Sequence, residues 1–282
     1  MKKCLISIMA VVSLLPTCAL AGTDGFRNTM RQEVCDTVRY MVAYDMTYVN
    51  DTTKAEWERK TEPMRLEIGD KSTKFYSYTA YLEDSLNAKR EARGEQLATY
   101  TADVTWQVYR NYPKEGSFTF LDDLIAMNYY AVTEPMKSPE WTPVADSTAT
   151  ILGNECHLAT AWYKGRWWFA WYADDVPIDA GPWKLCGLPG LILRAYDGGR
   201  QYVFEATAMR QVADGTPIMY QGLDYEPVTF DQLMTQYERY YADPIGYLAL
   251  FTPGMMTADD GKSASELNTP KNLPFNPIEL AE

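Results

Sequence analysis

The sequence is poor in the residues on which common catalytic sites depend. It has one histidine, His157, among 282 residues, so a site with several histidine ligands is excluded and a Ser-His-Asp triad would have to use that residue. It also lacks the GxSxG, HExxH, glycine-rich phosphate-loop and CxxC patterns of hydrolases, zinc proteases, nucleotide-binding proteins and redox proteins. We therefore expect no metal and no cofactor, and the sequence favours a non-enzymatic role.

Long apolar runs are missing beyond residue 21, so we expect no transmembrane segment. Before that point, two lysines precede an apolar run from Cys4 to Leu15, and small residues follow. This pattern predicts a secretory signal peptide over residues 1–21 that is cleaved after Ala21. The protein is then exported and acts in the periplasm or in association with the outer membrane. Lipid attachment at Cys18 is the alternative.

Basic charge is also scarce. The formal net charge is -12, and loss of residues 1–21, which hold two lysines and no acids, changes it to -14. A chain this acidic is not expected to bind nucleic acid, because that affinity depends on lysine and arginine neutralising phosphates. With 46% hydrophobic and 13% aromatic residues, residues 22–260 can form a single β-rich domain. Residues 261–282 are polar and contain proline, which predicts an extended or disordered tail.

Cysteine is limited to three residues after cleavage, Cys35, Cys156 and Cys186. An odd number in an oxidising compartment leaves at least one thiol without an intramolecular partner. We predict a disulfide between Cys156 and Cys186, since it would tie the start of the central hairpin to the turn-rich segment after it. Cys35 would then be free or paired with another molecule. Three buried thiols are the alternative.

Tryptophan, in contrast, is concentrated between Cys156 and Asp197, which hold five of the eight. Alternation on either side of Lys164-Gly165 predicts a hairpin with a two-residue loop. In this register three cross-strand pairs share one bulky apolar face with Cys156, namely Trp162 with Trp167, Thr160 with Phe169, and Leu158 with Trp171. We expect this face to form the core or a groove. The opposite, mixed face carries His157, Trp168 and Tyr172.

Turn signals and alternation extend this hairpin into a larger sheet. Leu188 to Leu191 fits a type II turn in which Gly190 supplies a positive φ. Strands are expected over residues 37–48, 74–81, 101–112, 124–132, 148–152, 191–196 and 201–207, and a helix or mobile insertion over 84–98. A second helix begins at Thr229, with Gln232 completing a capping box. The predicted fold is mainly β, an antiparallel curved sheet or half-barrel with one or two peripheral helices.

The segment after the hairpin resembles the signature of the GLPGLI family of exported bacterial proteins. The signature residues are Gly187, Leu188, Pro189, Gly190, Leu191 and Ile192, preceded by Gly181-Pro182-Trp183-Lys184. Further positions that look like the family pattern are Ile151-Leu152-Gly153, Cys156, Gly165-Arg166, Ala170-Trp171-Tyr172, Val176-Pro177-Ile178 and Asn276-Pro277-Ile278-Glu279-Leu280. The resemblance implies an exported cell-envelope protein, and it implies no reaction, cofactor or catalytic residue.

Two groups of residues are candidates for a functional site. Asp174 and Asp175, together with Glu155 and Asp179, form the densest acidic cluster. Paired carboxylates there could serve a hydrolase as general acid and base or take Ca²⁺, although solvated loop acids are the simpler interpretation. Trp141, Trp168, Trp183 and Tyr172 lie outside the predicted apolar face and are the ligand-binding candidates.

Three functional hypotheses follow from these observations. The first is a binding or accessory protein that uses an aromatic sheet face or strand edge to hold an apolar ligand, a peptide or an envelope protein. The second is an acid/base hydrolase that uses Asp174, Asp175 or Glu155. The third is a purely structural envelope protein whose aromatic face is filled from within. We favour them in that order.

Overall fold

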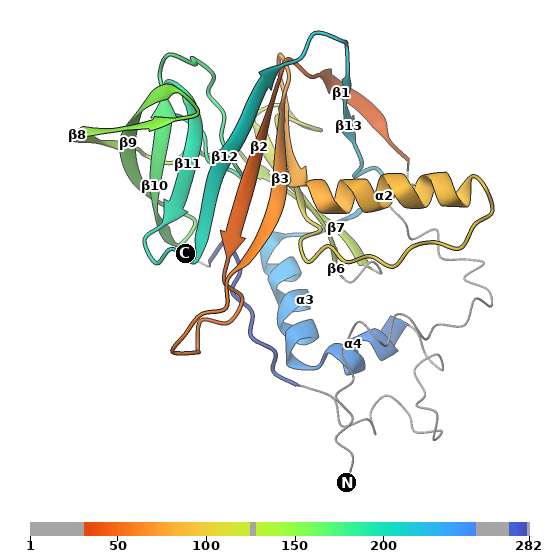
Figure 1. Cartoon of the computed structure of the whole chain (residues 1–282). Coiled ribbons are helices and arrows are strands. Elements are labelled where there is room, and N and C mark those ends of the chain that lie inside the picture. The colour runs from red at the N-terminus through yellow and green to blue at the C-terminus, as the bar shows by residue number, and fades with distance from the viewer. Residues whose placement is uncertain (1–30, 125–127, 252–270, 281–282) are drawn as a thin grey trace.

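A computed structural model of the chain describes residues 31–124, 128–251 and 271–280. Most of the regular structure in these residues is β-strand, gathered into one strongly curved sheet with helices at its side and below it (Figure 1). The predicted signal peptide, its cleavage site and residues 261–270 of the predicted tail lie outside the described residues. The tail and the domain boundaries therefore stay predictions.

Twelve strands form the sheet, in the order β14-β7-β6-β5-β4-β3-β2-β12-β11-β10-β9-β8. Two meanders, β2 to β7 and β8 to β12, are joined where β2 pairs with β12, and only the contact of β14 with β7 is parallel. The strands are β2 (Tyr40–Tyr48), β3 (Lys60–Ile68), β4 (Thr73–Ser77), β5 (Gln107–Arg110), β6 (Ser117–Leu124), β7 (Asn128–Pro135), β8 (Thr142–Ile151), β9 (Asn154–Tyr163), β10 (Arg166–Ala173), β11 (Leu191–Asp197), β12 (Tyr202–Gln211) and β14 (Glu226–Pro227). The predicted fold class, an antiparallel curved sheet, is confirmed.

The curvature brings the two ends of this sheet together. Glu134 on β7 forms an ion pair with Lys164 in the turn between β9 and β10, at 2.8 Å. Arg110 on β5 similarly reaches Asp179, which follows β10, at 2.7 Å. The loop between β10 and β11 therefore closes the space that the curved sheet leaves between its ends.

A second, two-stranded sheet lies beside the first. It pairs β1 (Glu33–Thr37) with β13 (Pro217–Tyr220) in antiparallel fashion. Its residues form a small apolar cluster with Tyr109 of β5, in which the rings of Tyr109 and Tyr220 meet edge to face at 5.0 Å.

The helices of the described ranges, α2 (Tyr78–Glu91), α3 (Phe230–Ala242) and α4 (Pro244–Phe251), pack around the sheet. The capping box of α3 is confirmed, because Thr229 accepts from the Gln232 amide while the Gln232 side chain accepts from the Thr229 amide. Helix α2 begins earlier than the predicted 84–98, because the Ser77 hydroxyl accepts from the Ala80 amide and starts the helix at the end of β4.

Strand β3 falls between the predicted strands over 37–48 and 74–81, where no strand is predicted. Its apolar residues Met64, Leu66 and Ile68 are buried between β2 and β4, but charged residues interrupt their alternation. Two of these, Glu62 and Glu67, are themselves buried and accept hydrogen bonds from Ser77 and Tyr76 of β4. Buried, hydrogen-bonded carboxylates thus concealed a core strand. The predicted strand over 101–112 is limited to β5.

The main core lies on the inner face of the sheet. Its largest fully buried side chains include Tyr44, Phe75, Trp168 and Phe204, and the Phe204 ring contacts both Phe75 and Trp168. Residues of β2, β4, β10 and β12 therefore share one apolar interior.

The signature turn differs from the predicted one. Gly190 does not adopt a positive φ; among the signature glycines Gly187 does, at 89°. A Cβ atom on Gly190 would lie 1.9 Å from the carbonyl oxygen of Ala173. Glycine is thus required at position 190 because the backbone at Ala173 lies too close for a side chain. This close approach lets β11 pair with the end of β10.

Residues 271–280 form no helix or strand but lie against the sheet, and we call them the docked segment. In Figure 1 this segment runs from below α3 to the base of β10 to β12. Asn276, Ile278 and Glu279 are buried within it. An irregular segment without apolar periodicity is therefore part of the folded body.

No helix among the described residues is both long and apolar enough to cross a membrane.

We predict that Gly190→Ala destabilises the fold. The new methyl group would overlap the Ala173 carbonyl, and relief of that overlap requires β10 and β11 to separate locally. The free energy of unfolding in urea is expected to fall by about 1–3 kcal/mol or more. Gly198→Ala is the matched control, because its Cβ would find its nearest neighbour at 3.6 Å, and a change within about 0.5 kcal/mol is expected. Equal stability of the two variants would contradict this account of Gly190.

Candidate binding site

The hairpin register is as predicted, but its two faces are exchanged. Trp162 pairs with Trp167, Thr160 with Phe169 and Leu158 with Trp171. The prediction that this face forms the core or a groove is wrong, since Trp162 is 53% exposed and Trp167 55% exposed. The inner face instead carries three alanines, Ala159, Ala161 and Ala170, beside Trp168. Small residues are needed there because the loop after β10 packs on this face and fills it, with Trp183 against Trp168 at 5.5 Å.

The exposed side of the hairpin forms a continuous aromatic surface, which we call the outer aromatic face. It consists of Trp162, Trp167, Phe169 and Tyr196. The two indoles meet edge to face at 5.8 Å, and Phe169 stacks on Tyr196 with ring planes 6° apart. Arg200, in the turn after β11, places its guanidinium 4.2 Å from the centre of the Tyr196 ring. Regular strand pairing therefore holds four aromatic rings and one cation on the same side of β9 to β11.

The four aromatic residues predicted to bind a ligand lie in or against the core. Trp168 is fully buried, Trp183 and Tyr172 nearly so, and Trp141 is half-buried with its indole N–H donating to the Cys186 carbonyl at 2.7 Å. The face assignment that made them candidates is the one that the structure reverses. As long as the loop and the docked segment stay in place, these rings act in packing.

The acidic candidates are on the surface. Glu155, Asp174 and Asp175 are exposed, and Asp174 lies 3.7 Å from the His157 ring nitrogen. Asp179 points elsewhere, to Arg110 and to the amide of Gly187. Within the ranges that the structure describes, no group of three or more histidine, cysteine or acidic side chains is arranged to hold a metal ion. Catalysis by these carboxylates stays a prediction.

The predicted disulfide between Cys156 and Cys186 is not formed, and Cys35 is also a thiol. Cys186 is held toward the connection between β7 and β8, where its sulfur lies 3.5 Å from the Ser138 hydroxyl, while Cys156 belongs to β9. Burial raises the pKa of the Cys35 and Cys156 thiols to about 11 and raises that of Cys186 as well. Protonated thiols of this kind are poor nucleophiles at neutral pH.

A second site lies on the inner side of the same hairpin. Lys164, Arg166 and Lys184 project from the hairpin turn, from β10 and from the loop after it, and together they hold the docked segment. We call these three residues the cationic cradle. Arg166 and Lys184 are 5% and 1% exposed, so each must have a buried acceptor.

Two glutamates neutralise the lysines of the cradle. The Lys184 ammonium lies 2.6 Å from both Glu134 of β7 and Glu279 of the docked segment. Lys164 contacts the same two carboxylates at 2.8 and 2.6 Å. The four side chains form an alternating ring of charges that joins one end of the sheet, the signature loop and the docked segment.

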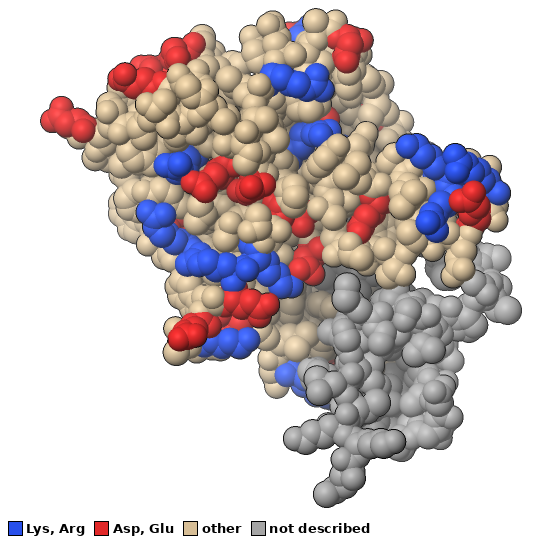
Figure 2. Space-filling model, in the orientation of Figure 1, with Lys and Arg blue, Asp and Glu red and all other residues tan. Residues whose placement is uncertain are grey.

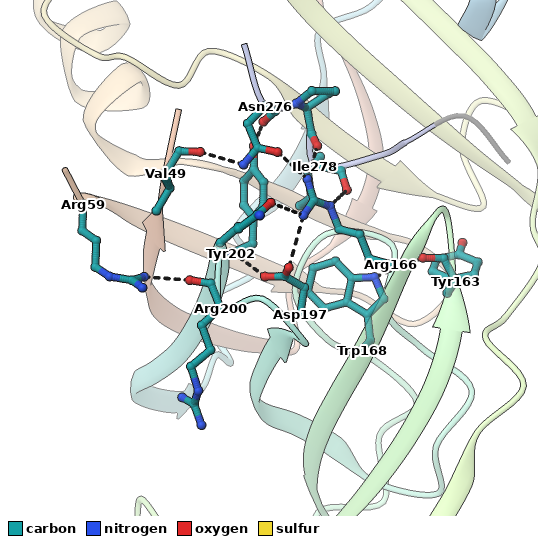
Figure 3. A network of polar contacts seen from close by, with 12 residues as sticks. Val49, Arg59, Tyr163, Arg166, Trp168, Asp197, Arg200, Tyr202, Asn276 and Ile278 are labelled. Atoms are coloured by element: carbon teal, nitrogen blue, oxygen red, sulfur yellow. Dashed lines mark hydrogen bonds and ion pairs between the residues drawn. The ribbon is translucent and has the colours of Figure 1, made fainter. Parts of the chain in front are cut away.

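Arg166 makes the second half of the cradle (Figure 3). Its guanidinium donates to the carbonyls of Pro277 and Ile278 and to the side chain of Asn276, at 2.6 to 2.9 Å. It is paired with Asp197 at the end of β11, at 3.2 Å. The Tyr202 hydroxyl donates to the backbone carbonyl of Asn276. The side-chain amide of Asn276 donates in turn to the carbonyl of Val49. The groups that these bonds join come from β10 to β12, from the docked segment and from Val49, which directly follows β2.

The electrostatics of the lysine ring favour its ionised form. Burial alone would raise the pKa of Glu134, but the charges of Lys184 and Lys164 outweigh it and the pKa lies below its usual value of 4.5. Burial likewise opposes the charge on Lys164, yet its hydrogen bonds to Glu134 and Glu279 raise its pKa above 10.5. The carboxylate of Glu134 and the ammonium of Lys164 are therefore both favoured in their charged forms.

Sequence reasoning missed the cradle as a site. Arg166, Lys184 and the docked residues Asn276 to Leu280 belong to positions that carry the family resemblance, whereas Lys164 does not, and nothing in their spacing places them together. The available signal was a lysine directly after an indole in an otherwise apolar, turn-rich stretch. Such a lysine suggests a buried charge that needs a carboxylate partner from elsewhere.

Charge over the rest of the visible surface is mixed. Figure 2 shows Lys and Arg interspersed with Asp and Glu in small groups over the described part of this face. The last turn of α2 adds Lys89 and Arg90 as one local basic group. An extended basic surface of the kind that binds nucleic acid is not seen on this face.

We predict that Lys184→Met strongly destabilises the protein. The substitution leaves the half-buried Glu134 and the buried Glu279 with one remaining lysine, and loss of one partner from a buried ion pair typically costs about 3–5 kcal/mol. Urea unfolding followed by tryptophan fluorescence measures this change. Lys114→Met, at an exposed position, is the control and should change stability by less than about 0.5 kcal/mol. A Lys184→Met protein as stable as this control would show that the ring contributes nothing to folding.

A pH dependence follows from the pKa of Glu134. Because this pKa is lower in the folded state, the ring stabilises the fold fully above pH 4.5 and loses this contribution as the pH falls through the folded value. The difference in unfolding free energy between the wild type and Glu134→Gln should therefore be largest near pH 7 and shrink below pH 4.5. Urea midpoints measured from pH 7 to pH 3 give this difference, and a constant value across the range would refute the assignment.

Comparison with known proteins finds a family resemblance for one part of the chain. Residues 154–194, which span β9, β10, the signature loop and the start of β11, match the sequence profile described as "Protein of unknown function (Porph_ging)". This supports a resemblance to a family without an assigned activity, whereas the finer GLPGLI resemblance stays a prediction. None of the curated proteins compared with this chain matches it.

Solved structures match this chain at low sequence identity. PNGF-II in two crystal forms is 14% identical, with TM-scores of 0.47 and 0.45, and the match covers 70% and 71% of this chain. The chain spans about a third of the length of PNGF-II, since 32% of each PNGF-II chain is covered. A chain from the complex of Pseudomonas aeruginosa MucA/MucB is 10% identical, with a TM-score of 0.30, over 80% of this chain and 59% of the other.

Proposed function

We propose that this chain is an exported, non-enzymatic binding protein that docks another protein through the outer aromatic face. The observation that carries the proposal is the exposure of Trp162 and Trp167, 53% and 55%, as neighbours on a regular and well-packed hairpin. Large apolar side chains that are adjacent, exposed and rigidly held are typical of interaction surfaces. The inner face offers no comparable surface, because the signature loop and the docked segment fill it.

The composition of the outer aromatic face favours a protein partner. Tryptophan, tyrosine and arginine are the residues that most often dominate binding energy in protein interfaces. Here two tryptophans, Tyr196 and Arg200 are close together, and the ion pair of Arg194 with Glu205 lies beside them at 2.9 Å. An apolar centre with a charged rim is the usual arrangement of such an interface. Strand pairing on both sides of β10 also limits the entropy that the rings would lose on binding.

Charge narrows the chemistry of the partner. Arg200 is exposed, and within the described residues its guanidinium forms no ion pair with a carboxylate. A partner that places an acidic side chain next to its apolar contact would pair with Arg200 at the edge of the indoles. The proposed partner is therefore a protein with an apolar patch flanked by aspartate or glutamate.

The outer aromatic face can be tested by site-specific cross-linking in the native envelope. A photo-reactive amino acid at position 167 should capture one defined partner, whereas the same group at Leu82 on α2 should not, although Leu82 is also exposed at 49%. The captured protein is then identified and purified, so that binding can be measured directly.

With that purified partner, Trp162→Ala/Trp167→Ala is expected to weaken binding by at least about 2 kcal/mol, or roughly 30-fold. Arg200→Glu should slow association and reverse the salt dependence of the rate. The control is Leu82→Ala/Leu86→Ala, which removes two exposed apolar side chains from α2. Unchanged affinity in the tryptophan variant, with its fold intact by circular dichroism, would refute the proposed surface.

A further inference from the structure

The docked segment is held in the manner of a bound peptide. Between Asn276 and Leu280 the segment makes polar contacts with Tyr202, Lys184, Arg166 and Val49. These partners lie 74 to 227 positions away in the sequence. The segment forms no strand pairing with the sheet. Its attachment therefore depends on the cradle and on the end of α3, where Lys271 pairs with Asp243 and the amides of Asn272 and Leu273 donate to backbone carbonyls.

Most of this recognition is directed at the backbone. Arg166 donates to two successive carbonyls, those of Pro277 and Ile278, and Tyr202 donates to the carbonyl before them. At the far end the Leu280 amide donates to the carbonyl of Lys164. Contacts of this kind align any extended chain that passes through the cradle.

Side chains select which chain fits. Asn276 accepts from Arg166 and donates to the Val49 carbonyl, so an amide at this position satisfies both groups. Three positions later Glu279 supplies the carboxylate between the two lysines. Ile278 is 7% exposed and packs into the main core, while Phe275 stacks on Tyr241 at 4.4 Å. The cradle thus reads the pattern Phe-Asn-Pro-Ile-Glu.

An empty cradle is electrostatically unfavourable. Without Glu279, the ammonium groups of Lys164 and Lys184 would share only Glu134, which leaves one positive charge without a carboxylate. Because an unpaired charge in the cradle is unfavourable, the docked segment can leave only when another carboxylate takes the place of Glu279. Exchange of one acidic segment for another is therefore favoured over simple opening.

The length of chain around the segment allows such an exchange. Helix α4 ends at Phe251 and the segment begins at Lys271, so 19 residues separate the two. At full extension this length spans about 60 Å, which is enough to reach the cradle of an adjacent molecule. The sequence that satisfies every contact is the one that each copy already carries.

We propose that the cationic cradle is a binding site for an extended acidic peptide in trans, and that its occupant is the 271–280 segment of a second copy of this chain. Reciprocal exchange gives a symmetric dimer in which each cradle keeps all of its contacts. This site is separate from the outer aromatic face, so the two proposals stand or fall independently.

The probe is a fluorescent synthetic peptide of residues 271–280, added to the full-length chain. Full-length Glu279→Gln, in which the resident segment has lost its carboxylate, should take up the wild-type peptide with saturable binding. A peptide with the same Glu279→Gln change should bind at least tenfold more weakly, because a charged hydrogen bond in the cradle is lost. The control is a peptide with Leu280→Ala, because the hydrogen bond of Leu280 to the Lys164 carbonyl is made by its backbone amide. This substitution should change the affinity by less than threefold.

Exchange between whole chains is tested by mixing two full-length proteins of different mass. Glu279→Gln keeps an intact cradle, and Arg166→Lys keeps an intact segment, so the mixture should form a heterodimer in native mass spectrometry that neither protein forms alone. If a variant fails to fold, uptake of the mass-labelled peptide by the wild-type chain over days replaces it. Absence of peptide uptake and of heterodimer, or equal binding of both peptides, would show that the segment is a fixed part of one fold and would overturn the proposal.

Discussion

The burial of two cations on one side of a hairpin, with a third half-buried beside them, is the constraint on which the structure depends. Arg166 and Lys184 are removed from water, and such charges are stable only with carboxylates and carbonyls in fixed positions. Those acceptors come from β7, from the end of β11 and from the docked segment. The requirement therefore fixes the curvature of the sheet, since β7 must approach the turn between β9 and β10, and it fixes the path of a segment that has no regular structure.

A filled interior changes where function can lie. Hypotheses that place a ligand on an inner aromatic face meet Trp183, the signature loop and the docked segment, which already pack against Trp168 and its neighbours. In this respect the inner face is as expected for a purely structural protein, in which the aromatic side chains are covered from within. The same alternation that turns Trp168 inward turns Trp167 outward, so the surface left for a partner is on the opposite side of β10.

Local rules predicted part of this fold well, and physical reasons explain where they stopped. The two-residue turn at Lys164-Gly165 fixes every pairing of the hairpin, and the side chains of Thr229 and Gln232 fix the start of α3 within four residues. Alternation separates two faces but does not say which one is covered, because the cover comes from a loop that lies outside the alternating pattern. The cradle could not be predicted either, since Glu134 and Glu279 lie 50 and 95 positions from Lys184 and only the curvature of the sheet brings them together.

The two sites are mechanically connected because they share one strand. Arg166 and Trp167 are adjacent on β10 and point to opposite faces, so the bonds that anchor the Arg166 guanidinium to Asp197 and to the docked segment also hold the backbone that carries Trp167. An anchored strand loses less conformational freedom when its exposed rings are covered, which favours binding on that face. Because a segment from a second copy would make the same bonds to Arg166, exchange in the cradle preserves the outer aromatic face. Two surfaces with different partners can thus operate on one hairpin without competing for the same side chains.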